Sequence, residues 1–225
     1  MEYKIFNVGS KSDGSWVRHH HFVNDPLEAD IITFPGGSDI HPEIYGEHCG
    51  SYTYPYEYCD KRDLSYIHDE RLKDKFKIGL CRGAQLLTAI SGGKLVQHLC
   101  PSHGGGHAMM IDNNPKHMIM VNSLHHQMMY PFNLPSEDYQ IIGRACNKAG
   151  LSLTDSFLNG EDLKIDMPSD TFGFIEPETV FYPKTLSLCF QFHPEMMSWD
   201  RNPIALAFCN SLLNKLYLQY VTTSK

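Results

Sequence analysis

The 225-residue sequence has no apolar run approaching the roughly 18 residues of a membrane-spanning helix, and its first residues lack the apolar core of a secretory signal. It also has no run of basic residues: 26 Asp and Glu outnumber 19 Lys and Arg, which gives a net charge of −7. We therefore expect neither a membrane nor a nucleic acid as its partner. The seven scattered cysteines include no CxxC pair, so we expect reduced thiols in a cytoplasmic protein rather than a disulfide scaffold.

Metal-binding motifs are missing as well. Thirteen histidines raise the alternative of a metal-binding protein, since His19–His21 form a cluster and His103 and His107 flank a triple glycine. A metal site needs three or four ligands in a compatible geometry, and the sequence contains no HExxH motif and no paired CxxC. We accordingly expect no metal and no other cofactor.

The arrangement of apolar segments predicts an α/β protein. We expect one domain over residues 1–225, because a chain of this length can bury a sizeable core and contains no internal repeat. The expected strands cover 3–8, 31–34, 77–81, 117–123, 139–145, 172–182 and 187–193, and the expected helices cover 60–76, 203–218 and a segment that starts at 82. This order predicts an open, mostly parallel sheet flanked by helices, with an antiparallel extension. We expect the polar stretch 150–172 to be a loop insertion.

A candidate nucleophile lies between a predicted strand and a predicted helix. Gly79, Cys81 and Gly83 form the G-x-nucleophile-x-G pattern, with cysteine where many hydrolases carry serine. The turn from strand to helix is so sharp that larger side chains two residues on either side would collide, which explains the glycines. It raises the sulfur above the sheet at the N-terminus of a helix, whose partial positive charge favours a thiolate.

A cysteine nucleophile needs a base, and the base needs a group that orients it. His193 follows the strand predicted at 187–193, and Pro194 biases it towards extended geometry. Because residues i and i+2 of an extended chain point the same way, Glu195 can reach the imidazole. We predict that Glu195 binds one ring nitrogen and leaves the other free for Cys81.

Backbone N–H groups can supply the oxyanion hole that such chemistry needs. Pro35, Gly36 and Gly37 follow the strand predicted at 31–34, and glycine tolerates the unusual backbone angles that aim N–H groups into a cleft. We predict one donor from Gly36 or Gly37 and a second from the N–H of Arg82.

Taken together, these motifs resemble the class I glutamine amidotransferase superfamily, and most closely its γ-glutamyl-γ-aminobutyrate hydrolase (peptidase C26-like) branch. The motifs that carry the resemblance are FPGGSDIHPEIYGE at 34–47, DKRD at 60–63, GLCRGAQLL at 79–87, NSLHHQ at 122–127 and FQFHPE at 190–195. They occur in the order that the family has.

The resemblance implies a flavodoxin-like fold and a Cys-His-Glu triad. In it, Cys81 attacks the side-chain amide of a glutamine-like substrate and forms a γ-glutamyl thioester. His193 protonates the leaving amine and then activates water, while Glu195 orients His193. Substrate-binding positions of the motifs carry over to three further residues, which are Gln85, His125 and His126.

The sequence leaves several functions open. One is a free-standing hydrolase of a small-molecule γ-glutamyl substrate, and another is a glutaminase subunit that delivers ammonia to a separate synthetase partner. No synthetase domain is fused here, which favours the first. A third reading, a non-catalytic domain on the same fold, is disfavoured because all three predicted triad residues are present. The amine half of the substrate and the oligomeric state are not determined at this level.

Overall fold

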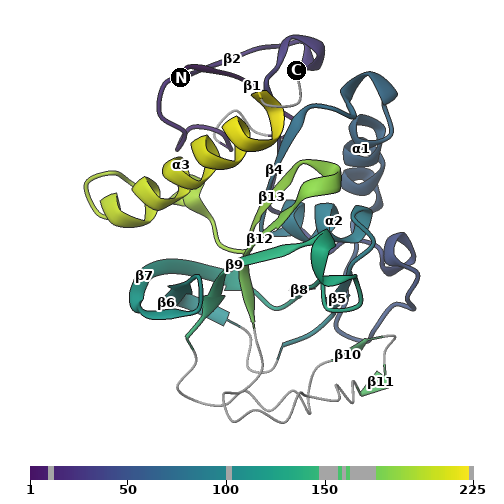
Figure 1. Ribbon diagram of the computed structural model, residues 1–225. Coiled ribbons are helices and arrows are strands. Elements are labelled where there is room, and N and C mark those ends of the chain that lie inside the picture. Colours follow the sequence, from purple (N-terminus) through teal and green to yellow (C-terminus); the bar gives the residue numbers. More distant parts are fainter. Residues whose placement is uncertain (10–12, 100–102, 147–156, 159–160, 163–175, 223–225) are drawn as a thin grey trace.

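The computed structural model describes residues 1–9, 13–99, 103–146, 157–158, 161–162 and 176–222, and a nine-stranded sheet runs through the molecule (Figure 1). Its spatial order is β2 (His20–Phe22), β1 (Tyr3–Asn7), β3 (Ile31–Phe34), β4 (Phe76–Leu80), β13 (Ser187–Phe190), β12 (Pro177–Tyr182), β9 (Gln140–Ala145), β6 (His103–Ile111) and β7 (Asn114–His125). The pairs from β2 to β13 are parallel, and the pairs from β13 to β7 are antiparallel. The observed sheet therefore has the parallel core and antiparallel extension that the sequence predicts.

Helices cover both faces of the sheet. Helices α1 (Glu57–Ile67) and α2 (Arg82–Ile90) lie on one side, and α3 (Pro203–Tyr217) lies on the other (Figure 1). Two small sheets pair β5 (Lys94–Val96) with β8 (Met128–Tyr130), and β10 (Phe157–Leu158) with β11 (Glu161–Asp162). Short helical turns connect these elements: η1 (Pro26–Glu28), η2 (Pro42–Tyr45), η3 (Glu70–Leu72), η4 (Ser136–Asp138), η6 (Pro183–Thr185), η7 (Pro194–Met196) and the π-helical η8 (Leu218–Thr222).

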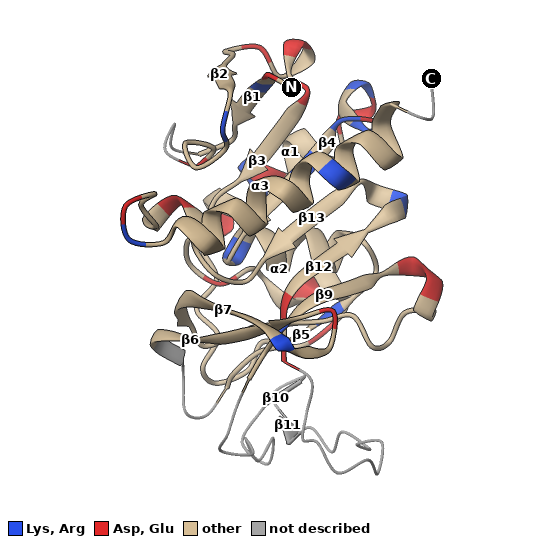
Figure 2. Ribbon diagram, turned by 60° about the vertical axis from the view of Figure 1, so that its left-hand side comes forward, with Lys and Arg blue, Asp and Glu red and all other residues tan. Residues whose placement is uncertain are grey.

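Neighbouring residues of the central strands face opposite helical layers. Ile31 and Leu188 belong to the apolar cluster formed with α3, whereas Ile32 and Cys189 belong to the cluster formed with α2. Strands buried on both faces read as continuous apolar runs, which is typical of parallel sheets. Figure 2 shows β3 and β13 free of charged residues, with Lys and Arg spread over separate elements of the described chain.

The observed elements differ from the predicted ones in several places, and strands β2, β5, β6 and β8 were not predicted. The helix expected over 60–76 starts at Glu57 and ends at Ile67, because the Asp69 side chain accepts from the Arg71 N–H and starts η3, and Phe76 already belongs to β4. Strand β6 was not predicted, because its HGGGHAMMI sequence begins with glycines that disfavour strands; its pairing with β7 overrides this preference.

Some predictions from the sequence concern parts of the chain that the structure describes only in part. The insertion expected at 150–172 lies outside the described residues apart from β10 and β11. A single domain over 1–225 stays a prediction. None of the helices in the described ranges combines the length and apolar character needed to cross a membrane.

Candidate active site

Three neighbouring parallel strands end at the same edge of the sheet and bring the predicted catalytic residues together. Strand β4 lies between β3 and β13, with Phe34 of β3 opposite Gly79 and Phe190 of β13 opposite Leu80. The segments that follow these strands, with the Pro35–Gly37 loop, Cys81 and His193, therefore start at the same level. This edge, outside the carboxyl ends of the strands, is where open α/β sheets bind ligands.

Cys81 lies on a strained turn between β4 and α2. Its φ of 49° and ψ of −104° are rare for a residue with a side chain, and such conformations persist only where the surroundings enforce them. A Cβ added to Gly79 would lie 2.6 Å from the Gly83 carbonyl, and one added to Gly83 would lie 2.2 Å from the Phe34 carbonyl oxygen. The expected need for glycine at both positions is therefore confirmed by the backbone contacts.

His193 lies between Cys81 and Glu195. Its Nδ1 is 2.7 Å from Glu195 Oε1, and its ring interacts with the Cys81 side chain. Burial alone lowers the pKa of His193, but the interactions with Cys81 and Glu195 outweigh it and raise the pKa to about 10. The hydrogen bonds to Cys81 and Glu195 therefore favour the protonated imidazole.

The Pro35–Gly37 loop packs directly against this pair. A Cβ on Gly36 would lie 2.8 Å from His193 Cε1 and 3.8 Å from Cys81 Cβ, so a side chain there would displace the imidazole. Gly37 has a φ of +155°, which side-chain-bearing residues rarely adopt. The N–H groups of Gly36 and Gly37 have no backbone acceptor among the described residues, and the N–H of Arg82, in the first turn of α2, has no acceptor within its helix. All three are thus available for the predicted oxyanion hole, whose role stays a prediction.

The Arg82 side chain anchors α2 to α1. It is buried and forms ion pairs with Asp60, at 2.6 Å, and with Asp63. Arg62 binds the other oxygen of Asp63 at 2.7 Å, and Asp60 also accepts from the His41 N–H. This network holds the residue after the nucleophile, although only its backbone was assigned a role from the sequence.

Two positioning contacts were not predicted. The Asn122 side chain accepts from the His193 N–H and donates to the His193 carbonyl, both at 2.8 Å. The Gln191 amide nitrogen lies 3.8 Å from the Cys81 sulfur, and the Gln191 amide oxygen accepts from the Met129 N–H. Both residues belong to motifs noted in the sequence, NSLHHQ and FQFHPE, which was the signal available.

A cavity of about 520 Å³ lies beside His193. Its lining residues are Gly9, Asp13, Pro35, Gly36, Gly37, Cys59, Arg62, His193, Glu195 and Met196. Cys81 is buried and does not belong to this lining, so the imidazole and the Gly36 backbone separate the sulfur from the cavity.

The three predicted substrate-binding residues lie outside that lining. Gln85 is buried and its amide donates to the Gln127 carbonyl at 3.2 Å, while His125 is buried and its Nδ1 binds the same carbonyl at 2.9 Å. His126 is half-buried, with Nε2 3.1 Å from Asp39 Oδ1, and this contact raises its pKa. Their role in substrate binding stays a prediction.

The other described cysteines differ from Cys81 in their surroundings. All six described cysteines are free thiols, as expected, while Cys100 lies outside the described residues. Burial raises the pKa of the Cys189 and Cys209 thiols, which keeps them protonated in the apolar clusters. Cys59 lines the cavity and is the nearest alternative thiol for a ligand bound there.

One group of residues could hold a metal ion. Ligand atoms of His125, Glu176 and Glu178 all lie within 4.8 Å of one another, and all three residues are buried. The sequence motifs did not bring these residues together.

Comparison with known proteins agrees with the class of protein that the site geometry indicates. The family model described as Peptidase C26 matches residues 27–195, a span that contains Cys81, His193 and Glu195. A curated protein of Mycobacterium tuberculosis, provisionally named a glutamine amidotransferase, is 28% identical over 155 residues, which is 67% of this chain. The chain spans about half the length, 49%, of that relative.

Solved structures share the fold. A glutamine amidotransferase from Thermotoga maritima matches with a TM-score of 0.53 and 13% identity, covering 98% of this chain and 86% of that one. A protein from Thermoplasma acidophilum, provisionally described as a GMP synthase subunit, matches with a TM-score of 0.53 and 16% identity, covering 95% of this chain and 97% of that one. At these identities the likeness concerns the fold alone, and it confirms the predicted class I glutamine amidotransferase fold.

Proposed function

The chain belongs to the Peptidase C26 family, within the class I glutamine amidotransferase-like superfamily, and we propose on this premise that it hydrolyses a γ-glutamyl amide with Cys81 as the nucleophile. The observation that carries the proposal is the convergence of Cys81, the His193 imidazole and the Gly36 backbone where three parallel strands end. A thiol, a base and unpaired N–H donors around one point are the parts that acyl transfer requires.

The proposed reaction has two stages. The Cys81 sulfur attacks the γ-carbonyl carbon of the substrate, and His193 protonates the departing amine as the C–N bond breaks. This leaves a γ-glutamyl thioester on Cys81. His193, now neutral, takes a proton from water as the water attacks the thioester carbonyl, and the thiolate leaves with release of glutamate. Glu195, 2.7 Å from Nδ1, holds the imidazole in one orientation throughout.

Developing negative charge needs stabilisation at both stages. We propose that the N–H groups of Gly36, Gly37 and Arg82 stabilise the carbonyl oxygen of a substrate on Cys81; preorganised donors of this kind contribute about 3–4 kcal/mol each. Since Cys81 is buried behind His193 and Gly36, we propose that the Pro35–Gly37 loop shifts when substrate enters.

A glutamine analogue tests the nucleophile and the substrate class together. We expect 6-diazo-5-oxo-L-norleucine to add one label per chain, located on Cys81 by peptide mass spectrometry. Cys59 is the internal control, because it lines the cavity and would be labelled by simple proximity. A label on Cys59 that persists in Cys81→Ala, with Cys81 unlabelled in the native chain, would refute the assignment.

A second candidate function is a glutaminase subunit that passes ammonia to a synthetase. It is favoured by the names of the related proteins, which include a glutamine amidotransferase and a provisionally described GMP synthase subunit. The isolated protein distinguishes the two functions when it is assayed with glutamine and with γ-glutamyl-γ-aminobutyrate. Turnover of the second substrate by the isolated chain supports the free-standing hydrolase, whereas inactivity towards both until a synthetase is added supports the subunit.

A further inference from the structure

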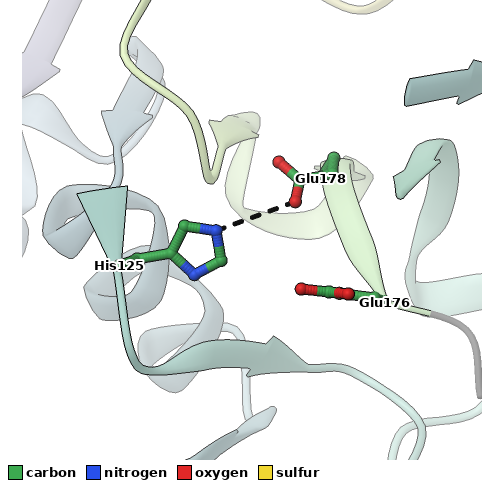
Figure 3. Close-up of side chains that lie close together, drawn as sticks. All are labelled: His125, Glu176 and Glu178. Atoms are coloured by element: carbon green, nitrogen blue, oxygen red, sulfur yellow. Dashed lines mark ion pairs between the residues drawn. The ribbon is translucent and has the colours of Figure 1, made fainter. Parts of the chain in front are cut away.

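We infer that His125, Glu176 and Glu178 form a binding site for a divalent first-row transition-metal ion such as Zn²⁺, in the antiparallel half of the sheet. Figure 3 shows the His125 ring and the Glu178 carboxylate facing each other, with the Glu176 carboxylate on the same side. The site includes none of the proposed triad residues, although His125 is also a predicted substrate-binding residue, and it departs from the expectation of no metal that the sequence motifs support.

The two carboxylates are enclosed in the protein. Glu178 is 0% exposed and Glu176 is 2% exposed, and they flank Pro177 at the start of β12, where alternate residues point the same way. Burying a carboxylate is unfavourable unless cations or hydrogen-bond donors compensate it. A divalent ion supplies that compensation with a single occupant.

Glu178 retains an unused ligand atom. Its Oε1 lies 3.0 Å from His107 Nε2, while its Oε2 has no hydrogen-bond partner among the residues that the structure describes. His107 thus holds one oxygen and leaves the other for an ion, as outer contacts of metal ligands do.

The His125 ring is oriented as a metal ligand. A carbonyl oxygen can only accept, so the 2.9 Å contact with the Gln127 carbonyl places the proton on Nδ1. The lone pair of a neutral His125 is then on Nε2, which lies 3.7 Å from Glu178 Oε1. Donation from Nδ1 to a backbone carbonyl is the usual second contact of a metal-bound histidine.

The spacing also suits a small ion. Ligand atoms at about 2.0–2.1 Å from a tetrahedral zinc lie roughly 3.3 Å apart. The three ligand atoms here already lie within 4.8 Å of one another, so they need to approach by about 1.5 Å at most. One nitrogen and two carboxylate ligands favour zinc-like ions over calcium and magnesium, which prefer oxygen alone. The register of β6 and β7 places Ser123 on the same face as His107 and His125, and its buried hydroxyl has no partner among the described residues, which offers a further polar contact beside the ion.

Metal uptake by the full chain tests the site without any assay of hydrolysis. Protein dialysed against a chelator and then titrated with Zn²⁺ should bind one ion per chain, measured by calorimetry and by elemental analysis after gel filtration. Glu178→Gln and His125→Gln should each weaken binding at least about 100-fold. Glu137→Gln in η4 and His117→Gln on β7, which change exposed residues, should leave the affinity unchanged.

X-ray absorption identifies the ligands and keeps the test decisive if a variant fails to fold. The bound zinc should show nitrogen and oxygen neighbours at about 2.0–2.1 Å and no sulfur at about 2.3 Å. Sulfur scattering would assign the ion to the free cysteines and overturn the inference. Folded native protein that takes up no Zn²⁺ would also overturn it. Because neither readout depends on turnover, the proposed hydrolase can fail while this site stands, and the reverse also holds.

Discussion

The parallel half of the sheet (β2, β1, β3, β4 and β13) and its antiparallel half (β12, β9, β6 and β7) present polar groups in different ways. In the parallel half, Cys81, Gly36 and His193 follow the ends of three strands and face a site beside a cavity. In the antiparallel half, His107 and Glu178 lie within paired strands and His125 lies at the end of one. The protein encloses this cluster.

The difference follows from how each kind of strand is covered. Parallel strands buried by helices on both faces are apolar throughout, so polar function is confined to their ends. Successive side chains of an antiparallel strand point to opposite faces of the sheet. A polar face that other parts of the protein cover can therefore enclose charged groups. The two halves therefore separate a reactive site from a buried charged cluster within one sheet.

The largest expected effect comes from removing the reactive sulfur in the parallel half of the sheet. Replacing Cys81 with Ala should lower turnover of γ-glutamyl amides by about 10⁴-fold or more, because no other group can form the thioester. Steady-state kinetics measures this, with Cys59→Ala as the control that keeps activity. Unchanged turnover in Cys81→Ala, with the native circular dichroism spectrum, would show that Cys81 is not the nucleophile.

The next largest effect is on stability, and it comes from adding a side chain to a crowded glycine in the parallel half and to an uncrowded one in the antiparallel half. Gly83→Ala should destabilise the protein by about 3 kcal/mol or more, because its Cβ would lie 2.2 Å from the Phe34 carbonyl oxygen, which belongs to rigid backbone. Gly105→Ala in β6 meets no atom within 4 Å, so only its φ of +103° opposes it, at about 1–2 kcal/mol. Urea denaturation of both variants measures the contrast; equal losses would show that the turn at Cys81 can relax.

A third variant tests whether the antiparallel half supports the reactive site. Asn122 comes from β7 and holds both backbone groups of His193 at 2.8 Å. Asn122→Ala should reduce kcat about 10–100-fold and change KM much less, because a misplaced imidazole affects proton transfer more than substrate binding. Leu124→Ala, an exposed neighbour on the same strand, is the control. An equal effect of both variants would mean that β7 acts through general stability.

The smallest expected effect concerns pH. The pKa of His193, about 10, lies above the ordinary value of about 6.5, so its interactions stabilise the fold fully below pH 6.5 and lose this contribution as the pH rises through 10. Glu195→Gln removes one anionic partner and should lower this pKa by about one unit or more, so the loss shifts to lower pH. NMR titration of the His193 ring measures the shift, with Glu137→Gln as the control; an unchanged midpoint would assign the raised pKa to Cys81 alone.

Local patterns predicted much of the parallel half. Strands β3 and β4, helix α3 and the turn at Cys81 each depend on a few consecutive residues, such as the apolar run Ile31–Phe34 ended by Pro35. The contact of His193 with Glu195 was also local, since the two are separated only by Pro194. The end of α1 was missed because Asp69 stops it by a side-chain cap that competes with the helical pattern.

Local patterns predicted less of the antiparallel half. β6 forms despite its glycines because β7 supplies the pairing, and Asn122 contacts His193 across 71 positions of the chain. No short window contains both members of either contact. The same holds for His125 and Glu178, which lie 53 positions apart and meet only when β12 and β7 occupy one sheet.

The amino-acid sequence by itself determined the apolar strands of the parallel core, the glycine-flanked turn that carries Cys81 and the pairing of His193 with Glu195, because neighbouring residues and their steric limits decide each of these. Only the tertiary structure decided that three strand ends meet at one edge, that Asn122 holds His193 and that buried carboxylates face His125. These depend on strand order and register, which arise from burying the whole sheet at once rather than from any segment alone.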